Sequence, residues 1–192
     1  MITRQYYYPY TACLHALCNA HHLRELARAY EQDNQQWAKD MQALLQDILE
    51  EVKAQSGSLS AEQARHYTEY YRNLLKHAES ECPPPDEARK PGQRGWVKRS
   101  KASNLLDRLQ LYEQDVHRFM TNPIVPFTNN QGENDIRMTK VHQKISGCFR
   151  SKDGADSFCR VRSYLSTCRK NNVSASQALA LLFDGKMPDF IL

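Results

Sequence analysis

Residues 37–52 read WAKDMQALLQDILEEV, and this stretch decides the fold class. Its apolar residues recur every three or four positions, which places them on one face of a helix. They are Trp37, Met41, Leu44, Leu45, Ile48, Leu49 and Val52. Residues 67–75 and 105–119 repeat this spacing with tyrosine and leucine. The three stripes predict a mainly α fold, in which helices pack on one another or on a partner.

Start and stop signals lie on both sides of that stretch. Asn34 is placed to cap its helix, and Ser60 with Gln63 forms a capping box that opens the next one. Proline lacks the backbone amide that a helix interior needs, so the prolines at 83–85 end that helix. We expect a loop after them and one long helix over 105–119.

The two ends of the chain add shorter elements. Residues 6–17 mix aromatic, β-branched and small side chains, which favours one short strand, whereas residues 18–30 have helical spacing. Beyond the long helix we expect further helices from near Asn130, over 155–170 and over 176–183.

The composition narrows the class of protein. Of the 192 residues, 41% are apolar and 25% are charged, which is typical of a globular protein. No apolar run is long enough to cross a bilayer, so no membrane partner is expected. Residues 1–11 lack the cleavage site of a secretion signal, so we expect a cytoplasmic protein whose six cysteines are reduced. Neither the GxxxxGK[ST] phosphate loop nor the GxSxG nucleophile turn occurs in the sequence.

Basic residues are concentrated in one segment. Residues 137–170 hold nine lysines and arginines against two aspartates, an excess of seven in a chain whose net charge is only +4. Such a segment is the electrostatic footprint of a phosphate-binding surface, although a solvated helix face has the same composition. The residues that we expect to touch DNA are Arg137, Lys140, Lys144, Arg150, Lys152, Arg160 and Arg162.

Glu133 lies in the segment TNNQGENDIR at residues 128–137. Asn130 followed by Glu133 is typical of a helix start, where the amide caps the first turn and the carboxylate meets the positive end of the dipole. A carboxylate on such a rigid element can also bind a metal ion, and two-metal phosphoryl transfer needs several of them. The two roles are compatible, because a first-turn glutamate can point outward.

Cysteine and histidine cluster near the amino end, at Cys13, His15, Cys18, His21 and His22. Their spacing is compatible with zinc, but a structural zinc site usually needs a second pair of ligands, and none follows. The other interpretation is that Cys18 and His21 pack at a strand-to-helix junction.

Three stretches together resemble the insertion sequence 66 family of bacterial transposases. They are HALCNAHHLREL at 15–26, VPFTNNQGENDIRM at 125–138 and KISGCFRS at 144–151, the last followed by RSYLST at 162–167. Their order and spacing agree as well, so the resemblance covers nearly the whole chain.

The resemblance implies the C-terminal portion of a ribonuclease-H-like (α/β) catalytic domain with a large helical insertion, most of the central sheet being missing. Residues 1–30 would be a remnant of that core with its Cys-x-x-His element, and residues 31–125 the insertion. Residues 126–192 would return to the core and carry the third acidic residue of a DDE active site.

The implied activity is metal-dependent cleavage of DNA at transposon ends, followed by attack of the freed 3′-hydroxyl on target DNA. Glu133 would be the catalytic carboxylate and a ligand of Mg²⁺ or Mn²⁺. Cys18, His21, Asn129 and Asn130 would form the supporting motifs.

The first two catalytic aspartates of this family should lie upstream of the residues present here. Because one carboxylate cannot hold two metal ions, we expect a truncated chain that is inactive by itself and binds no metal tightly. Its expected partners are transposon-end and target DNA, together with a second copy or an intact transposase. The alternative is a non-catalytic DNA-binding or dimerising remnant that modulates intact transposase.

Overall fold

The computed structural model describes residues 13–83 and 99–191, and within these ranges it contains helices and no strand. The chain divides into two compact units, Met1–Asn129 and Asn130–Leu192. The mainly α prediction is therefore confirmed, while the ribonuclease-H-like origin stays a prediction. Among the helices described, none has the length and apolar character needed to span a membrane.

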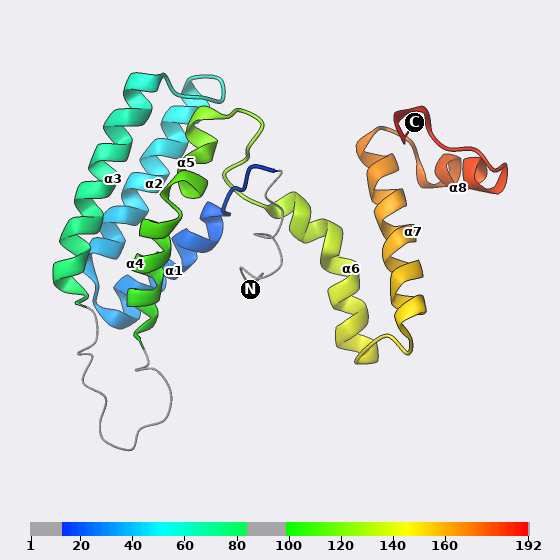
Figure 1. Cartoon of the computed structure of the whole chain (residues 1–192), viewed down its shortest axis with the longest axis horizontal. Coiled ribbons are helices and arrows are strands. Elements are labelled where there is room, and N and C mark those ends of the chain that lie inside the picture. Colours follow the sequence, from blue (N-terminus) through cyan, green and yellow to red (C-terminus); the bar gives the residue numbers. More distant parts are fainter. Residues whose placement is uncertain (1–12, 84–98, 192) are drawn as a thin grey trace, which may run out of the picture. The chain divides into compact units, whose positions relative to one another are not determined.

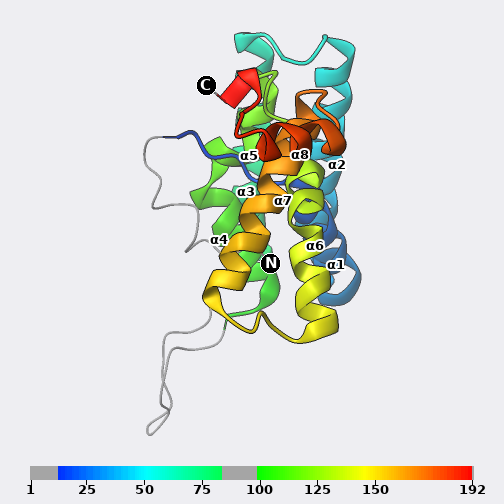
Figure 2. The ribbon, with the colours of Figure 1, turned by 90° about the vertical axis from the view of Figure 1, so that its right-hand side faces the viewer.

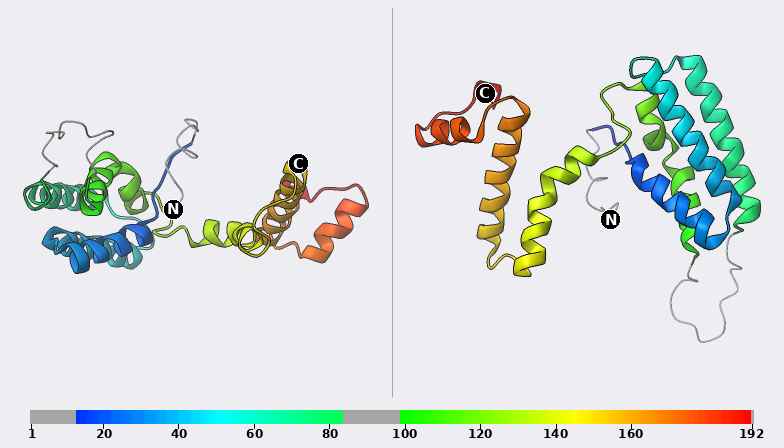
Figure 3. Two further views of the ribbon diagram at one scale, coloured as in Figure 1. Left: turned by 90° about the horizontal axis from the view of Figure 1, so that it is seen from below. Right: turned by 180° about the vertical axis from the view of Figure 1, so that it is seen from behind.

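The first unit is a helical bundle (Figure 1). Its helices are α1 (Asn19–Asp33), α2 (Gln36–Ala54), α3 (Ala61–Glu81), α4 (Lys101–Leu111) and α5 (Glu113–Thr121). The stripe predicted over 37–52 forms the centre of this bundle, where Trp37, Met41 and Ile48 are almost fully buried. α2 packs against both α1 and α3, as the views from below and behind show (Figure 3).

Of the two helix-start signals predicted on either side of α2, one is confirmed and the other is wrong. The capping box at Ser60 is confirmed, because the serine hydroxyl accepts the Gln63 amide and the Gln63 side chain accepts the Ser60 amide. The prediction for Asn34 is wrong. Its φ of 52° lies in the left-handed region, which asparagine tolerates, so Asn34 ends α1 and Gln35 precedes α2.

Replacing Ser60 by alanine is expected to lower the free energy of unfolding by about 1 kcal/mol, because the Gln63 amide loses its acceptor. Urea unfolding followed by Trp37 fluorescence, in a Trp96→Phe background, would measure this loss. Ser58→Ala is the matched control, since Ser58 precedes the helix. Equal losses for the two variants would contradict the capping role.

The single long helix predicted over 105–119 is wrong in one respect, since it is divided into α4 and α5 at Tyr112. The hydroxyl of Tyr71 donates to the carbonyl of Leu109 at 3.1 Å. In an uninterrupted helix that carbonyl accepts the amide of residue 113, which is the first residue of α5. The break therefore follows from a tertiary contact that the helical period does not reveal.

The strand predicted over 6–17 is absent from its described part, residues 13–17, and the remainder lies outside the described residues. The described part runs beside α5 instead. The amide of Leu17 donates to the carbonyl of Asp115 at 2.9 Å, and Arg118 Nε donates to the carbonyl of His15 at 2.5 Å. Two backbone groups of this segment, the Leu17 amide and the His15 carbonyl, thus bond to α5 and not to a neighbouring strand.

The second unit contains the helices expected near the carboxyl end. They are α6 (Asn130–Ser146), α7 (Lys152–Lys170), α8 (Ala175–Phe183) and the short 3₁₀ helix η2 (Asp189–Ile191). α6 and α7 lie side by side as an antiparallel hairpin (Figure 2). Gly147 ends α6 with a φ of 77°, a left-handed conformation that favours glycine.

Candidate functional site

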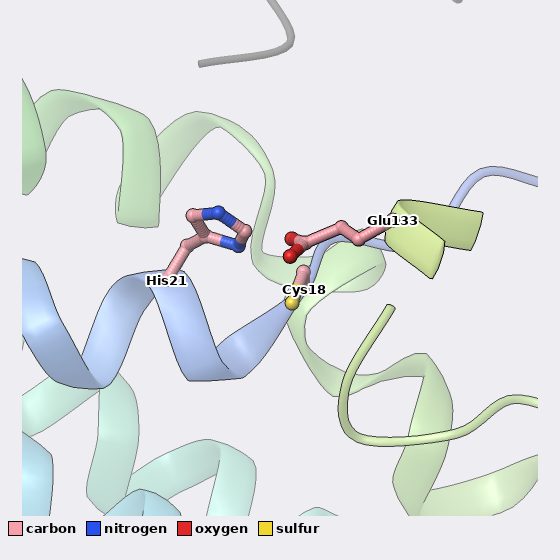
Figure 4. Close-up of side chains that lie close together, drawn as sticks. All are labelled: Cys18, His21 and Glu133. Atoms are coloured by element: carbon pink, nitrogen blue, oxygen red, sulfur yellow. The ribbon is translucent and has the colours of Figure 1, made fainter. Parts of the chain in front are cut away.

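The start of α1 holds the first of the predicted motifs. Cys18 is the N-cap residue of α1, and His21 lies in its first turn (Figure 4). Cys18 Sγ accepts the amide N–H of Asn129 at 3.2 Å, and the amide of Asn19 donates to the carbonyl of Phe127 at 3.0 Å. The structure therefore brings Cys18 and Asn129 together and fixes the chain just before α6 to the start of α1.

A buried polar pair that the sequence analysis missed holds this helix start in place. The Asn19 side chain donates to the carbonyl of Val116 at 3.0 Å and accepts from His22 Nδ1 at 3.0 Å. Burial, with a smaller contribution from the positive charge of Arg108, lowers the pKa of His22 to about 3. The helical period could have indicated that these two residues are buried, because Asn19 and His22 share a face of α1 with buried Leu26.

Glu133 lies in the first turn of α6, where the sequence predicts a helix start (Figure 4). Arg137, Lys140 and Lys144 follow it at intervals of four, three and four residues, so all four residues share one face of α6. The three cations are exposed, and no ion pair engages them within the described residues. We call these four residues the α6 stripe.

The opposite face of α6 is held against α7. Near the start of α6, Asp135 accepts hydrogen bonds from Ser166 Oγ at 2.7 Å and from Lys170 Nζ at 2.5 Å. Near its end, the ring of His142 packs on the ring of Phe158 of α7, with the two centroids 5.5 Å apart. Because Asp135 and His142 lie on the helix face away from the α6 stripe, these contacts leave the stripe facing away from α7.

The remaining predicted DNA contacts do not share this surface. Arg150 and Lys152 flank Ser151, the residue that caps α7 by accepting the Gly154 amide at 3.1 Å. They lie at the turn between the two helices of the hairpin.

The two arginines of α7 differ from the cations of the α6 stripe in their neighbours. Arg160 shares a helix face with Asp153 and Asp156, so its charge is partly offset there. Arg162 shares a face with Phe158 and Ser166, and Ser166 donates to Asp135 of α6. Sequence composition grouped all seven cations, whereas the structure separates three of them as one continuous stripe.

The carboxylates of this unit do not by themselves fit a centre of two metal ions. Glu133 belongs to the outward stripe, but Asp135 is engaged on the α7 side. A hydrogen bond from Lys170, with a second from Ser166, lowers the pKa of Asp135. The stripe therefore offers one carboxylate, and two-metal chemistry needs several.

Comparison with known proteins identifies the family. No curated protein and no solved structure shows a significant match to this chain. The family model described as Transposase IS66 family matches residues 4–157, a range that contains Cys18, Asn129 and the whole α6 stripe. Since this match covers most of the 192 residues, the chain belongs to the IS66 family of transposases.

Proposed function

We propose that α6 serves metal-dependent DNA transposition in two ways, by binding the phosphate backbone and by supplying a metal-binding carboxylate. The observation that carries the proposal is the α6 stripe, which joins three exposed cations to Glu133 on one helix face. Family membership makes DNA the partner of a transposase of this kind. Exposed cations in a row bind phosphates without reading the base sequence.

The arrangement along α6 has a directional consequence. From Lys144 to Arg137 the cations span about 10 Å of helix, and Glu133 lies about 6 Å further on. A DNA strand whose phosphates follow the cations is led to the carboxylate at the helix start. Glu133 would then contribute one ligand to an ion beside the bound phosphodiester.

Two ions require further carboxylates beyond Glu133, because each ion needs several oxygen ligands in a defined geometry. Mg²⁺ or Mn²⁺ bound by the complete set would polarise the phosphodiester. The residues of this chain contribute the positioning of the strand and the one carboxylate. We therefore propose that this chain acts in an assembly that carries the other ligands and is inactive without them.

Neutralising Arg137, Lys140 and Lys144 to glutamine is expected to weaken duplex DNA binding by at least about tenfold near 0.1 M salt. The slope of log K against log salt should become less steep by about 2.7, since each lost phosphate contact contributes about 0.9. Fluorescence anisotropy over a salt series would measure both quantities.

The matched control removes three exposed lysines of the first unit, Lys39, Lys53 and Lys76, and so changes the net charge equally. A second comparison reverses the charges of Lys140, Lys144, Arg150 and Lys152. Full affinity after that reversal, or an equal loss in the control, would contradict DNA binding by this segment. An unchanged slope in the α6 variant alone would place the phosphate contacts on α7.

A further inference from the structure

The last α-helix, α8, packs beside α7 and exposes apolar side chains on another of its faces (Figure 1). Toward α7, Ala178 is fully buried and its carbonyl accepts the Tyr164 hydroxyl at 2.8 Å. Leu182 and Phe183 lie three and four residues after Leu179, so these three side chains share a second face. Leu179 and Leu182 each keep 39% of their exposure, and Phe183 keeps 88%. We call these three residues the α8 patch.

The α8 patch lies in a unit that buries few side chains. Among the described residues of this unit, only Cys168, Ala178 and Pro188 are buried. The sequence of α8, ASQALALLF, contains no charged residue, and Met187 beyond it is also half exposed. A contiguous group of exposed apolar side chains is typical of a surface that binds another protein.

The two ends of α8 carry opposite charges. Before its start, Arg169 lies in the last turn of α7, is exposed and has no ion-pair partner in the described part of the chain. After its end come two acids, Asp184 and Asp189. Asp184 lies 3.9 Å from Lys186, but both side chains are about two-thirds exposed, so this pair is weak. The helix dipole has the same sense, positive at the start and negative at the end.

We propose that the α8 patch is a dimerisation surface, and that its partner is α8 of a second copy of this chain, packed antiparallel. A twofold axis brings the same patch of both copies together, so each apolar face covers the other. Antiparallel packing also places the start of one α8 beside the end of the other, so Arg169 of each copy meets Asp184 of the other. Parallel packing would place like charges together.

The uncharged centre of this surface also argues against the partner proposed for α6. DNA presents phosphates, which are matched by exposed cations and not by leucine and phenylalanine. A second α8 supplies an apolar face of equal length, about 13 Å for nine residues, with a complementary charge at each end. Dimerisation is therefore a function of this unit separate from DNA binding.

The first measurement is sedimentation equilibrium of the full chain up to about 0.1 mM, because an interface of this small size forms a weak dimer. A reducing agent is required, since exposed cysteines such as Cys148 and Cys159 can link copies through a disulfide. We expect the mass to rise with concentration toward twice that of one chain. The mass of a single chain at every concentration would overturn the proposal and assign the α8 patch to another partner.

Exchanging Phe183 for aspartate should weaken the dimer by at least about tenfold, because the twofold axis places the unpaired charge in the apolar interface twice. Ile124→Asp is the matched control, since Ile124 is 87% exposed in the first unit. It should leave the dimer unchanged. Because both side chains are exposed, both variants should fold. An equal effect of the two substitutions would contradict dimerisation through α8.

A charge exchange tests the antiparallel arrangement. Arg169→Glu alone, or Asp184→Arg alone, places like charges at both ends of the interface and should weaken the dimer by at least about fivefold at low salt. An equimolar mixture of the two variants forms a heterodimer in which both contacts join opposite charges. This mixture should recover the affinity of the unaltered chain. A mixture that dimerises no better than the separate variants would overturn the antiparallel pairing.

Discussion

Exchanging Glu133 for glutamine is expected to lower the rate of DNA cleavage by at least about a thousandfold while leaving DNA affinity nearly unchanged. Glutamine keeps the size of the side chain and its place in the first turn of α6 but removes the charge that binds a metal ion. Arg137, Lys140 and Lys144 remain exposed on the same face, so the strand can still bind. The measurement is strand cleavage in Mg²⁺ or Mn²⁺, in an assembly that supplies the further carboxylates.

The matched control is Asp156→Asn, which removes an exposed carboxylate of α7 from the same unit. It should cleave at the unaltered rate. If Glu133→Gln and Asp156→Asn cleave alike, Glu133 is not a metal ligand. A second measurement adds the unaltered chain or its Glu133→Gln variant to intact transposase. Equal inhibition by the two would support the alternative, in which this chain is a non-catalytic DNA-binding or dimerising remnant.

The part of the architecture that could be predicted from sequence is the part governed by periodicity along one helix. The stripe over 37–52 and the capping box at Ser60 depend on neighbours within one or two turns, and both are present. The failures at Asn34 and Tyr112 have a different cause. Asparagine is common both at the start and at the end of helices, and only the left-handed backbone of Asn34 shows that it ends α1. Tyr112 lies where the Tyr71 hydroxyl has engaged the Leu109 carbonyl.

The candidate site likewise has a part that spacing along one helix predicts and a part that depends on contacts between helices. Spacing alone places Glu133, Arg137, Lys140 and Lys144 on one face of a helix. It does not tell which face points outward, because that depends on Asp135 meeting Ser166 and Lys170 from a helix about thirty residues away.

Acidification from pH 7 to pH 5 is expected to lower the free energy of unfolding of the first unit by about 4 kcal/mol. His22 and His117 are both buried, and burial lowers their pKa values to about 3 and about 4 from an ordinary value of 6.5. As the pH falls below 6.5, the unfolded chain takes up a proton at each histidine and the folded unit does not. The free energy of unfolding is therefore at its full value above pH 6.5, and it decreases as the pH falls toward 4.

Charged neighbours modify this effect at each site without reversing it. Arg108 and His21 oppose a positive charge on His22, in the same direction as burial. At His117, Glu113 favours the charge and Arg72 opposes it, and burial remains the largest cause. Each histidine contributes a slope of about 1.4 kcal/mol per pH unit within the window, so both together account for most of the expected loss.

Urea unfolding of the whole chain at several pH values would measure the slope of the free energy of unfolding against pH. Unfolding is followed by Trp37 fluorescence in the Trp96→Phe background. His117→Gln replaces the titrating ring by a neutral side chain and should reduce the slope between pH 6 and pH 5 by about half. His66→Gln is the control, because His66 is exposed on the same bundle and should leave the slope unchanged. The pH range ends at 5 so that carboxylates, which titrate near pH 4, contribute little. A slope that persists in a His22→Gln, His117→Gln double variant would assign the acid sensitivity to other groups and show that the two buried rings take up protons in the folded state.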